Sequence, residues 1–174
     1  LVEGKKKEAA TFLTKVEEKN FSSIRIKELL FYSFLKLNQK NKAEKVFNEM
    51  SLKDLNLKPY RMSYFLNNDY LLNPIKTQKD GLAEILYNIS SWYYQKNLFK
   101  YSIFFGKLSL RVRPNFNAMK LLVVNALEEI GYEQLAVDLI SSVNKRNLYF
   151  MKFIKLKNSL SENFLSEKQL LDDL

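Results

Sequence analysis

Residues 83–116 read AEILYNISSWYYQKNLFKYSIFFGKLSLRVRPNF, and residues 117–150 read NAMKLLVVNALEEIGYEQLAVDLISSVNKRNLYF. The two segments align without a gap at an offset of 34 residues. The alignment places residues of the same kind opposite each other, as in Tyr93 with Leu127, Asn97 with Gly131, and Ser102 with Ala136. A fixed period of about 20–50 residues is typical of proteins built from stacked repeats. The sequence therefore predicts two consecutive structural units of equal length.

Helical periodicity extends beyond these two units to most of the chain. Apolar residues recur three and four positions apart, which is the spacing of one face of an α-helix. The chain has only 4 Gly and 3 Pro, too few for the many turns of a β-sandwich. We therefore expect an all-α fold, with helices over residues 5–19, 22–37, 42–51, 60–68, 81–96, 99–112, 115–130, 132–143, 148–159 and 162–172.

Particular residues are expected to begin or end these helices. Asp80, Ser161 and either Ser22 or Ser23 stand where an N-cap side chain would accept a backbone hydrogen bond. Pro114 follows a predicted helix directly, and Gly131 suits the left-handed conformation that often follows a helix C-terminus. These signals predict short links between consecutive helices.

The recurring positions resemble the tetratricopeptide (TPR) repeat pattern of large, small, turn-forming and Pro residues at fixed spacings. In residues 83–116 the matching positions are Leu86, Ile89, Ser90, Tyr93, Asn97, Phe99, Ser102, Ser109 and Pro114. In residues 117–150 they are Val123, Leu127, Gly131, Ala136 and Ile140, and in residues 24–57 they are Leu30, Phe34, Asn38, Ala43 and Phe47. The stretch 81–88 is also similar to the opening of the repeat region in TPR proteins of alphaproteobacteria. The resemblance implies a right-handed α-solenoid of antiparallel helix pairs.

One helical-repeat domain is expected to cover residues 1–174. Besides the three units, it would contain an irregular helical insert at about 58–82 and C-terminal capping helices at about 148–172. Two residues depart from the TPR pattern, because Gly106 replaces a large aromatic residue and Lys120 replaces a bulky apolar one. Because the sequence begins at Leu1 and not at Met, we expect it to be a piece of a longer protein.

The TPR resemblance implies a concave surface formed by the first helix of each pair. Applied by register, the positions on that surface are Glu84, Tyr87, Asn88, Ser91, Tyr94, Gln95, Leu121, Asn125, Glu128, Lys152 and Lys155. Tyr and Asn suit a peptide ligand, because they combine contact area with adaptable hydrogen bonding. The alternative is that Tyr87 and Tyr94 only pack on a neighbouring helix. For Trp92, the single tryptophan, we expect packing inside or between helices.

Several classes of chemistry are excluded by composition. The chain has no Cys and no His, so it contains no disulfide, no Cys/His zinc site and no Ser-His-Asp triad. No Gly-rich phosphate loop is present, since the four Gly residues lie far apart. We therefore expect a non-enzymatic protein without a cofactor, a scaffold that binds a protein or peptide.

The formal net charge of +9 leaves an alternative open. A basic chain built of helical repeats is compatible with nucleic-acid binding, although the scattered Lys and Arg residues do not favour it. The sequence contains no run of 18 apolar residues, so it predicts no membrane span. Uncovered apolar surface on terminal repeats would favour a homo-oligomer. The compartment, cytoplasm or periplasm, is not indicated.

Overall fold

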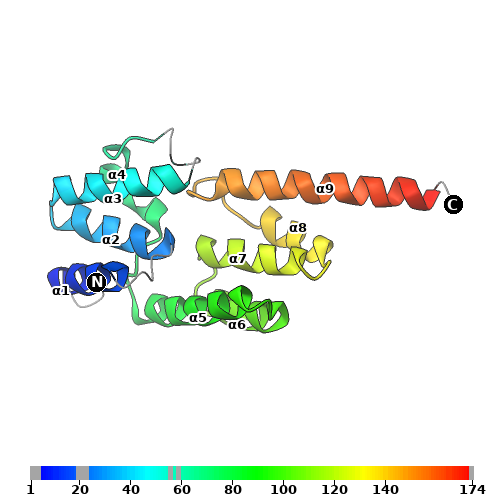
Figure 1. Cartoon of the computed structure of the whole chain (residues 1–174), viewed down its shortest axis with the longest axis horizontal. Helices are drawn as coiled ribbons and strands as arrows, with labels where there is room; N and C mark the ends of the chain where they lie inside the picture. The colour runs from blue at the N-terminus through cyan, green and yellow to red at the C-terminus, as the bar shows by residue number, and fades with distance from the viewer. Residues whose placement is uncertain (1–4, 19–23, 55–56, 58–59, 173–174) are drawn as a thin grey trace. The chain divides into compact units, whose positions relative to one another are not determined.

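A computed structural model describes residues 5–18, 24–54, 57 and 60–172, with side chains described up to residue 161 except at positions 6, 17 and 18. Within these ranges the chain is helical and contains no strand, which confirms the predicted all-α class. The chain divides into two compact units, Leu1–Gln78 and Lys79–Leu174. Figure 1 shows the helices of each unit.

The first unit is built around α2 (Ile24–Lys36), which contacts both α1 (Lys6–Glu18) and α3 (Lys40–Lys53). Its core is a cluster of three buried aromatic rings, Phe31, Phe47 and Phe65, with centroids 5.5–5.7 Å apart. Such edge and tilted ring pairs add to the stabilisation from burial alone. Phe65 lies on α4 (Tyr64–Asn67), so the short helix is held by this cluster.

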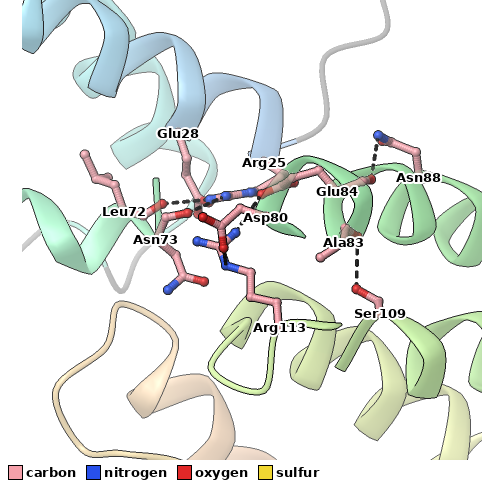
Figure 2. A network of polar contacts seen from close by, with 10 residues as sticks. All are labelled: Arg25, Glu28, Leu72, Asn73, Asp80, Ala83, Glu84, Asn88, Ser109 and Arg113. Carbon is pink, nitrogen blue, oxygen red and sulfur yellow. Dashed lines mark hydrogen bonds and ion pairs between the residues drawn. The ribbon is translucent and has the colours of Figure 1, made fainter. Parts of the chain in front are cut away.

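The insert of the first unit differs in detail from the expectation. The helix predicted over residues 60–68 is the single turn α4, and a 3₁₀ helix, η2 (Asp69–Leu72), follows it. The Arg25 guanidinium explains how this irregular segment is held. It is almost fully buried and donates hydrogen bonds to the backbone oxygens of Leu72 and Asn73, both at 2.7 Å, as Figure 2 shows. Glu28 Oε2, 2.9 Å from Arg25, balances the buried charge.

The second unit contains two antiparallel helix pairs and a long last helix. The first pair is α5 (Gln78–Gln95) with α6 (Phe99–Val112), the second is α7 (Asn117–Glu128) with α8 (Glu133–Ser141), and α9 (Phe150–Asp172) contacts α8. Small residues set the first pair close together. Ser90 Oγ donates to the Ser102 carbonyl at 2.8 Å, and Ser109 Oγ donates to the Ala83 carbonyl at 2.9 Å.

The same turn joins the helices of three pairs. Asn38, Asn97 and Gly131 follow α2, α5 and α7 respectively, with φ of 55°, 57° and 72°. After each of them the next residue donates its N–H to the carbonyl five residues earlier, at 2.9–3.0 Å. This is the Schellman arrangement, which satisfies the last carbonyls of a helix. The left-handed conformation predicted for Gly131 is confirmed.

Three predictions about helix ends and packing are wrong. Asp80 is not an N-cap, because α5 already begins at Gln78 and the Asp80 carboxylate pairs with Arg113. Ser161 is not a cap either, because α9 continues through it and its hydroxyl donates to the Lys157 carbonyl. The helices predicted over 148–159 and 162–172 are therefore one helix. Trp92 is 54% exposed instead of packed, because it lies away from the side of α5 that carries the buried Ser90.

Candidate partner-binding surface

Helices α5 and α7 lie side by side and run in the same direction. The Tyr87 ring, in the middle of α5, is 5.5 Å from the ring of Phe116, the residue just before α7. Near the last turn of each helix, Tyr94 Oη of α5 lies 3.4 Å from Glu129 Oε1 just after α7. Because both contacts follow the same order along the two helices, side chains from the second half of α5 and from α7 share one surface.

One side of α5 carries most of the residues predicted to meet a ligand. Tyr87, Ser91 and Tyr94 follow each other at helical spacing and are half-buried. Asn88 and Gln95 lie beside them and are exposed. The Tyr rings therefore form a partly covered platform, and the two amides stand in solvent next to it.

Glu84 lies on this side of α5 but is buried, with 7% of its surface exposed. Its Oε1 is 3.2 Å from Arg113 Nη1, and its backbone carbonyl accepts a hydrogen bond of 3.0 Å from the Asn88 side chain. The structure thus gives Glu84 a role in holding α5 to the end of α6. The Glu84 backbone carbonyl orients the Asn88 side chain one turn later.

Arg113 and Phe116 are residues that the sequence analysis did not single out. The Arg113 guanidinium lies between two carboxylates of α5, 2.9 Å from Asp80 Oδ1 and 3.2 Å from Glu84 Oε1 (Figure 2). It also lies over the Phe116 ring, 4.9 Å from its centroid. Phe116 in turn touches Tyr87, so the network fixes the start of the α5–α7 surface. The sequence signal that could have indicated Arg113 is the pair of carboxylates, Asp80 and Glu84, one turn apart on α5. Buried carboxylates require a cation nearby.

The far end of the α5–α7 surface is acidic. Burial raises the pKa of Tyr94, and the nearby Glu129 raises it further. Burial likewise raises the pKa of the Glu128 carboxyl, with added repulsion from Glu129 and Glu133. Three carboxylates that gather at one end of a basic protein provide a local site for a positively charged group of a ligand.

The remaining predicted residues lie on α7 and α9. Leu121 and Asn125 are half-buried on α7, where they extend the surface beside α5. Lys152 is half-buried on α9, with its Nζ 5.6 Å from the centroid of the Tyr149 ring, and Lys155 is exposed one turn later. The contacts that join α5 to α7 thus bring the residues of these two helices together, whereas the two lysines belong to a separate helix.

Comparisons with known proteins find no relative of this chain. No protein-family model matches the sequence, no curated protein matches it, and no solved structure matches the fold.

Two further features bear on the kind of site. Within the described part of the chain, no group of three or more acidic side chains is arranged to hold a metal ion. No helix in that same part is long and apolar enough to cross a membrane. The chemistry that the α5–α7 surface offers is hydrogen bonding by amides and hydroxyls, ring contact, and negative charge at one end.

Proposed function

We propose that this chain is a TPR-like protein-interaction scaffold without catalytic activity. In this proposal the helix pairs form a right-handed solenoid, and the α5–α7 surface binds an extended peptide or a segment of a partner protein. The observation that carries the proposal is the parallel, side-by-side placement of α5 and α7. Tyr87 and Phe116 join the middle of α5 to the start of α7, and Tyr94 and Glu129 join the ends of the two helices. Equivalent helices that lie side by side are how helical repeats build a continuous binding surface.

The repeated turns support the same proposal. Asn97 and Gly131 are 34 residues apart and have the same left-handed conformation and the same pair of backbone hydrogen bonds. Asn38 shows the same arrangement in the first unit. Turns of one kind at equivalent positions are expected when each helix pair is one copy of a repeated unit.

The side chains of the surface indicate the chemistry of the ligand. Tyr87 and Tyr94 offer contact area with few rotatable bonds, and Asn88 and Gln95 can both donate and accept hydrogen bonds, as a peptide backbone requires. Glu128 and Glu129 would favour Lys or Arg at one end of that peptide. We therefore expect a peptide with one basic end and an uncharged polar or aromatic middle.

A selection experiment followed by mapping tests this function. A library of random peptides displayed on phage is selected against the purified chain, and the best peptide is titrated into ¹⁵N-labelled protein. The proposal expects the largest amide shifts at Asn88, Ser91, Gln95 and Asn125. Shifts confined to the first unit or to α9 would reject the α5–α7 surface as the binding site.

The same titration separates peptide binding from nucleic-acid binding. Single-stranded RNA and DNA oligonucleotides of mixed sequence are added in place of the peptide, at low and at physiological salt. Nucleic-acid affinity that depends on phosphate contacts falls steeply with salt. Tighter binding of the oligonucleotide than of any selected peptide at physiological salt would overturn the proposal.

A further inference from the structure

The α5–α6 pair exposes a group of large apolar side chains. Ile85 and Trp92 lie two turns apart on α5, and Tyr101 and Phe104 lie one turn apart on α6. Each of the four is more than half exposed. Leu108, one turn beyond Phe104, is half-buried. We call these five residues the outer apolar face.

The rings of this face rest on a fixed platform. Tyr93 stacks on both Tyr101 and Phe105, with centroids 5.4 Å away in each case. Trp92 meets the edge of Tyr93 at 5.0 Å, and Phe104 meets the edge of Phe105 at 5.3 Å. Rings that are already held in place lose little conformational freedom when a partner covers them, which favours binding.

The outer apolar face lies on a different stripe of α5 from the Tyr rings of the α5–α7 surface. Residues 87, 91 and 94 follow one helical stripe, and residues 85 and 92 follow another. Asn88 and Gln95 lie between the two stripes, since each is three or four positions from Ile85 or Trp92. Contiguous apolar surface of this kind on a folded protein is a frequent sign of an interaction site.

Positive charge borders the outer apolar face along α6. This helix carries Lys100, Lys107 and Arg111 and has no acidic residue. All three cations are exposed, and none forms an ion pair within the described residues. A hollow beside Phe104 is lined by Phe104, Lys107, Leu108, Leu110 and Arg111, so apolar and cationic groups open on the same depression.

We propose that the outer apolar face is a second interaction surface, which binds an amphipathic helix of a partner protein with acidic residues along one edge of its apolar stripe. Apolar residues of the partner helix cover Trp92, Tyr101 and Phe104, and its carboxylates meet Lys100, Lys107 and Arg111. Charge complementarity of this type selects the partner and its orientation. A second copy of the same face is disfavoured, because symmetric pairing would bring like charges together. This inference does not depend on the proposed function of the α5–α7 surface.

Trp92 provides a direct measurement, because it is the only tryptophan of the chain. Three synthetic helical peptides without Trp are titrated while the Trp92 emission is followed. The first has a Leu/Phe stripe with Glu along one edge, the second has Lys in place of Glu, and the third has the first composition in scrambled order. The proposal expects a blue shift with the Glu peptide and at least about ten-fold weaker binding of the other two. Equal affinity for the Glu and Lys peptides, or no shift with the Glu peptide, would overturn it.

A charge-reversal variant provides the matched test. Lys107→Glu/Arg111→Glu changes two exposed side chains and is expected to fold, which circular dichroism verifies. The variant should prefer the Lys peptide over the Glu peptide, the reverse of the native chain. The matched control Lys145→Glu/Arg146→Glu makes the same change of charge at two exposed residues outside α5 and α6 and should keep the native preference for the Glu peptide. An unaltered preference in the Lys107/Arg111 variant, or a reversed preference in the control, would contradict the assignment.

Other ligands that combine apolar and anionic groups are separated by the same signal. Vesicles of phosphatidylcholine with phosphatidylglycerol, and single-stranded DNA, are titrated under the same conditions. If the vesicles or the DNA shift the Trp92 emission at a lower concentration than the Glu peptide does, the assignment of a protein partner is rejected. A shift that depends only on the concentration of the chain itself, together with dimers in sedimentation, would reject it in favour of self-association.

Discussion

Gly106 on α6 lies so close to Val123 on α7 that a Cβ at position 106 would stand 2.3 Å from Val123 Cγ2. Met119 Sδ would be 3.2 Å away from the same Cβ. The absence of a side chain at 106 therefore sets how closely the two helix pairs of the second unit approach. The TPR pattern has a large aromatic residue at this position, and here the neighbouring helix fills that space instead.

Replacement of Gly106 tests this close contact. Gly106→Ala should lower the free energy of unfolding by about 1–3 kcal/mol, because the core must move to accept the methyl group. The control is Gly81→Ala on α5, where a Cβ meets nothing within 4 Å. That change should raise the free energy of unfolding by about 0.5–1 kcal/mol through helix propensity. Urea denaturation measures both, and equal effects of the two substitutions would contradict the packing.

The left-handed turns at Gly131 and Asn97 predict different effects of substitution on stability. Gly131→Ala should lower the free energy of unfolding by about 1–2 kcal/mol, because its φ of 72° brings Cβ into conflict with the backbone. Asn97→Gly should cause no loss, since Gly adopts the same conformation freely. Thermal unfolding monitored by circular dichroism measures the two variants. A Gly131→Ala protein as stable as the native chain would show that this turn is not the one described.

Arg113 should stabilise the second unit by balancing two carboxylates. Arg113→Met leaves Asp80 and Glu84 without this cation and should lower the free energy of unfolding by about 2–4 kcal/mol. Adding Asp80→Asn and Glu84→Gln to the same chain should restore about 1 kcal/mol or more, because neutral amides do not repel each other. A double-mutant cycle by urea denaturation gives this coupling. Strictly additive effects would argue against the ion-pair network.

Lys120 should make the stability of the second unit depend on alkaline pH. It is almost buried, its Nζ donates to the Ser142 carbonyl and hydroxyl at 3.3 and 3.2 Å, and burial lowers its pKa. Between the lowered pKa of the folded chain and the ordinary value of 10.5, the unfolded chain binds more protons, so stability rises with pH across this window.

The variant Lys120→Met tests that dependence. It replaces the charged side chain by an unbranched apolar one that is one atom shorter and should raise the free energy of unfolding at pH 7 by about 1 kcal/mol. Its stability should rise less with pH above neutrality than that of the native chain. Ser142 Oγ still donates to the Leu139 carbonyl at 2.7 Å, so the substitution does not remove the last partner of that hydroxyl. Equal slopes for variant and native chain would contradict a desolvated ammonium group.

Local sequence signals predict a helix well where residues that interrupt helices stand at both of its ends. Helix α6 has the predicted bounds 99–112, because the turn at Asn97 and Pro114 enclose it. The predicted division between residues 159 and 162, with Ser161 as a cap, is wrong, because α9 is continuous there. No Gly or Pro stands there, and a Ser inside a helix can bond to its own backbone, so the helix continues.

The candidate surfaces depended on tertiary contacts that periodicity does not report. The helical spacing of α5 predicts two stripes, but not which of them another helix covers. The register predicts Tyr87 on the concave surface, and its ring contact with Phe116 agrees with the alternative that it packs on its neighbour. Trp92 was expected to be covered and is exposed, because α7 packs on another side of the α5–α6 pair. The role of Arg113 is not predictable from local sequence, because its partners Asp80 and Glu84 lie about thirty residues earlier in the chain.

The affinity of a selected peptide for two matched double variants tests the central claim most directly. Asn88→Ala/Gln95→Ala removes two exposed amides from the α5–α7 surface, and Gln134→Ala/Asn158→Ala removes two exposed amides from α8 and α9. Isothermal titration calorimetry with the same peptide gives Kd for the native chain and for each variant. We expect the first variant to bind about five- to ten-fold more weakly, from the loss of about 1 kcal/mol of hydrogen bonding, and the second to bind like the native chain. Equal Kd values for all three proteins would contradict the claim that the α5–α7 surface holds the partner.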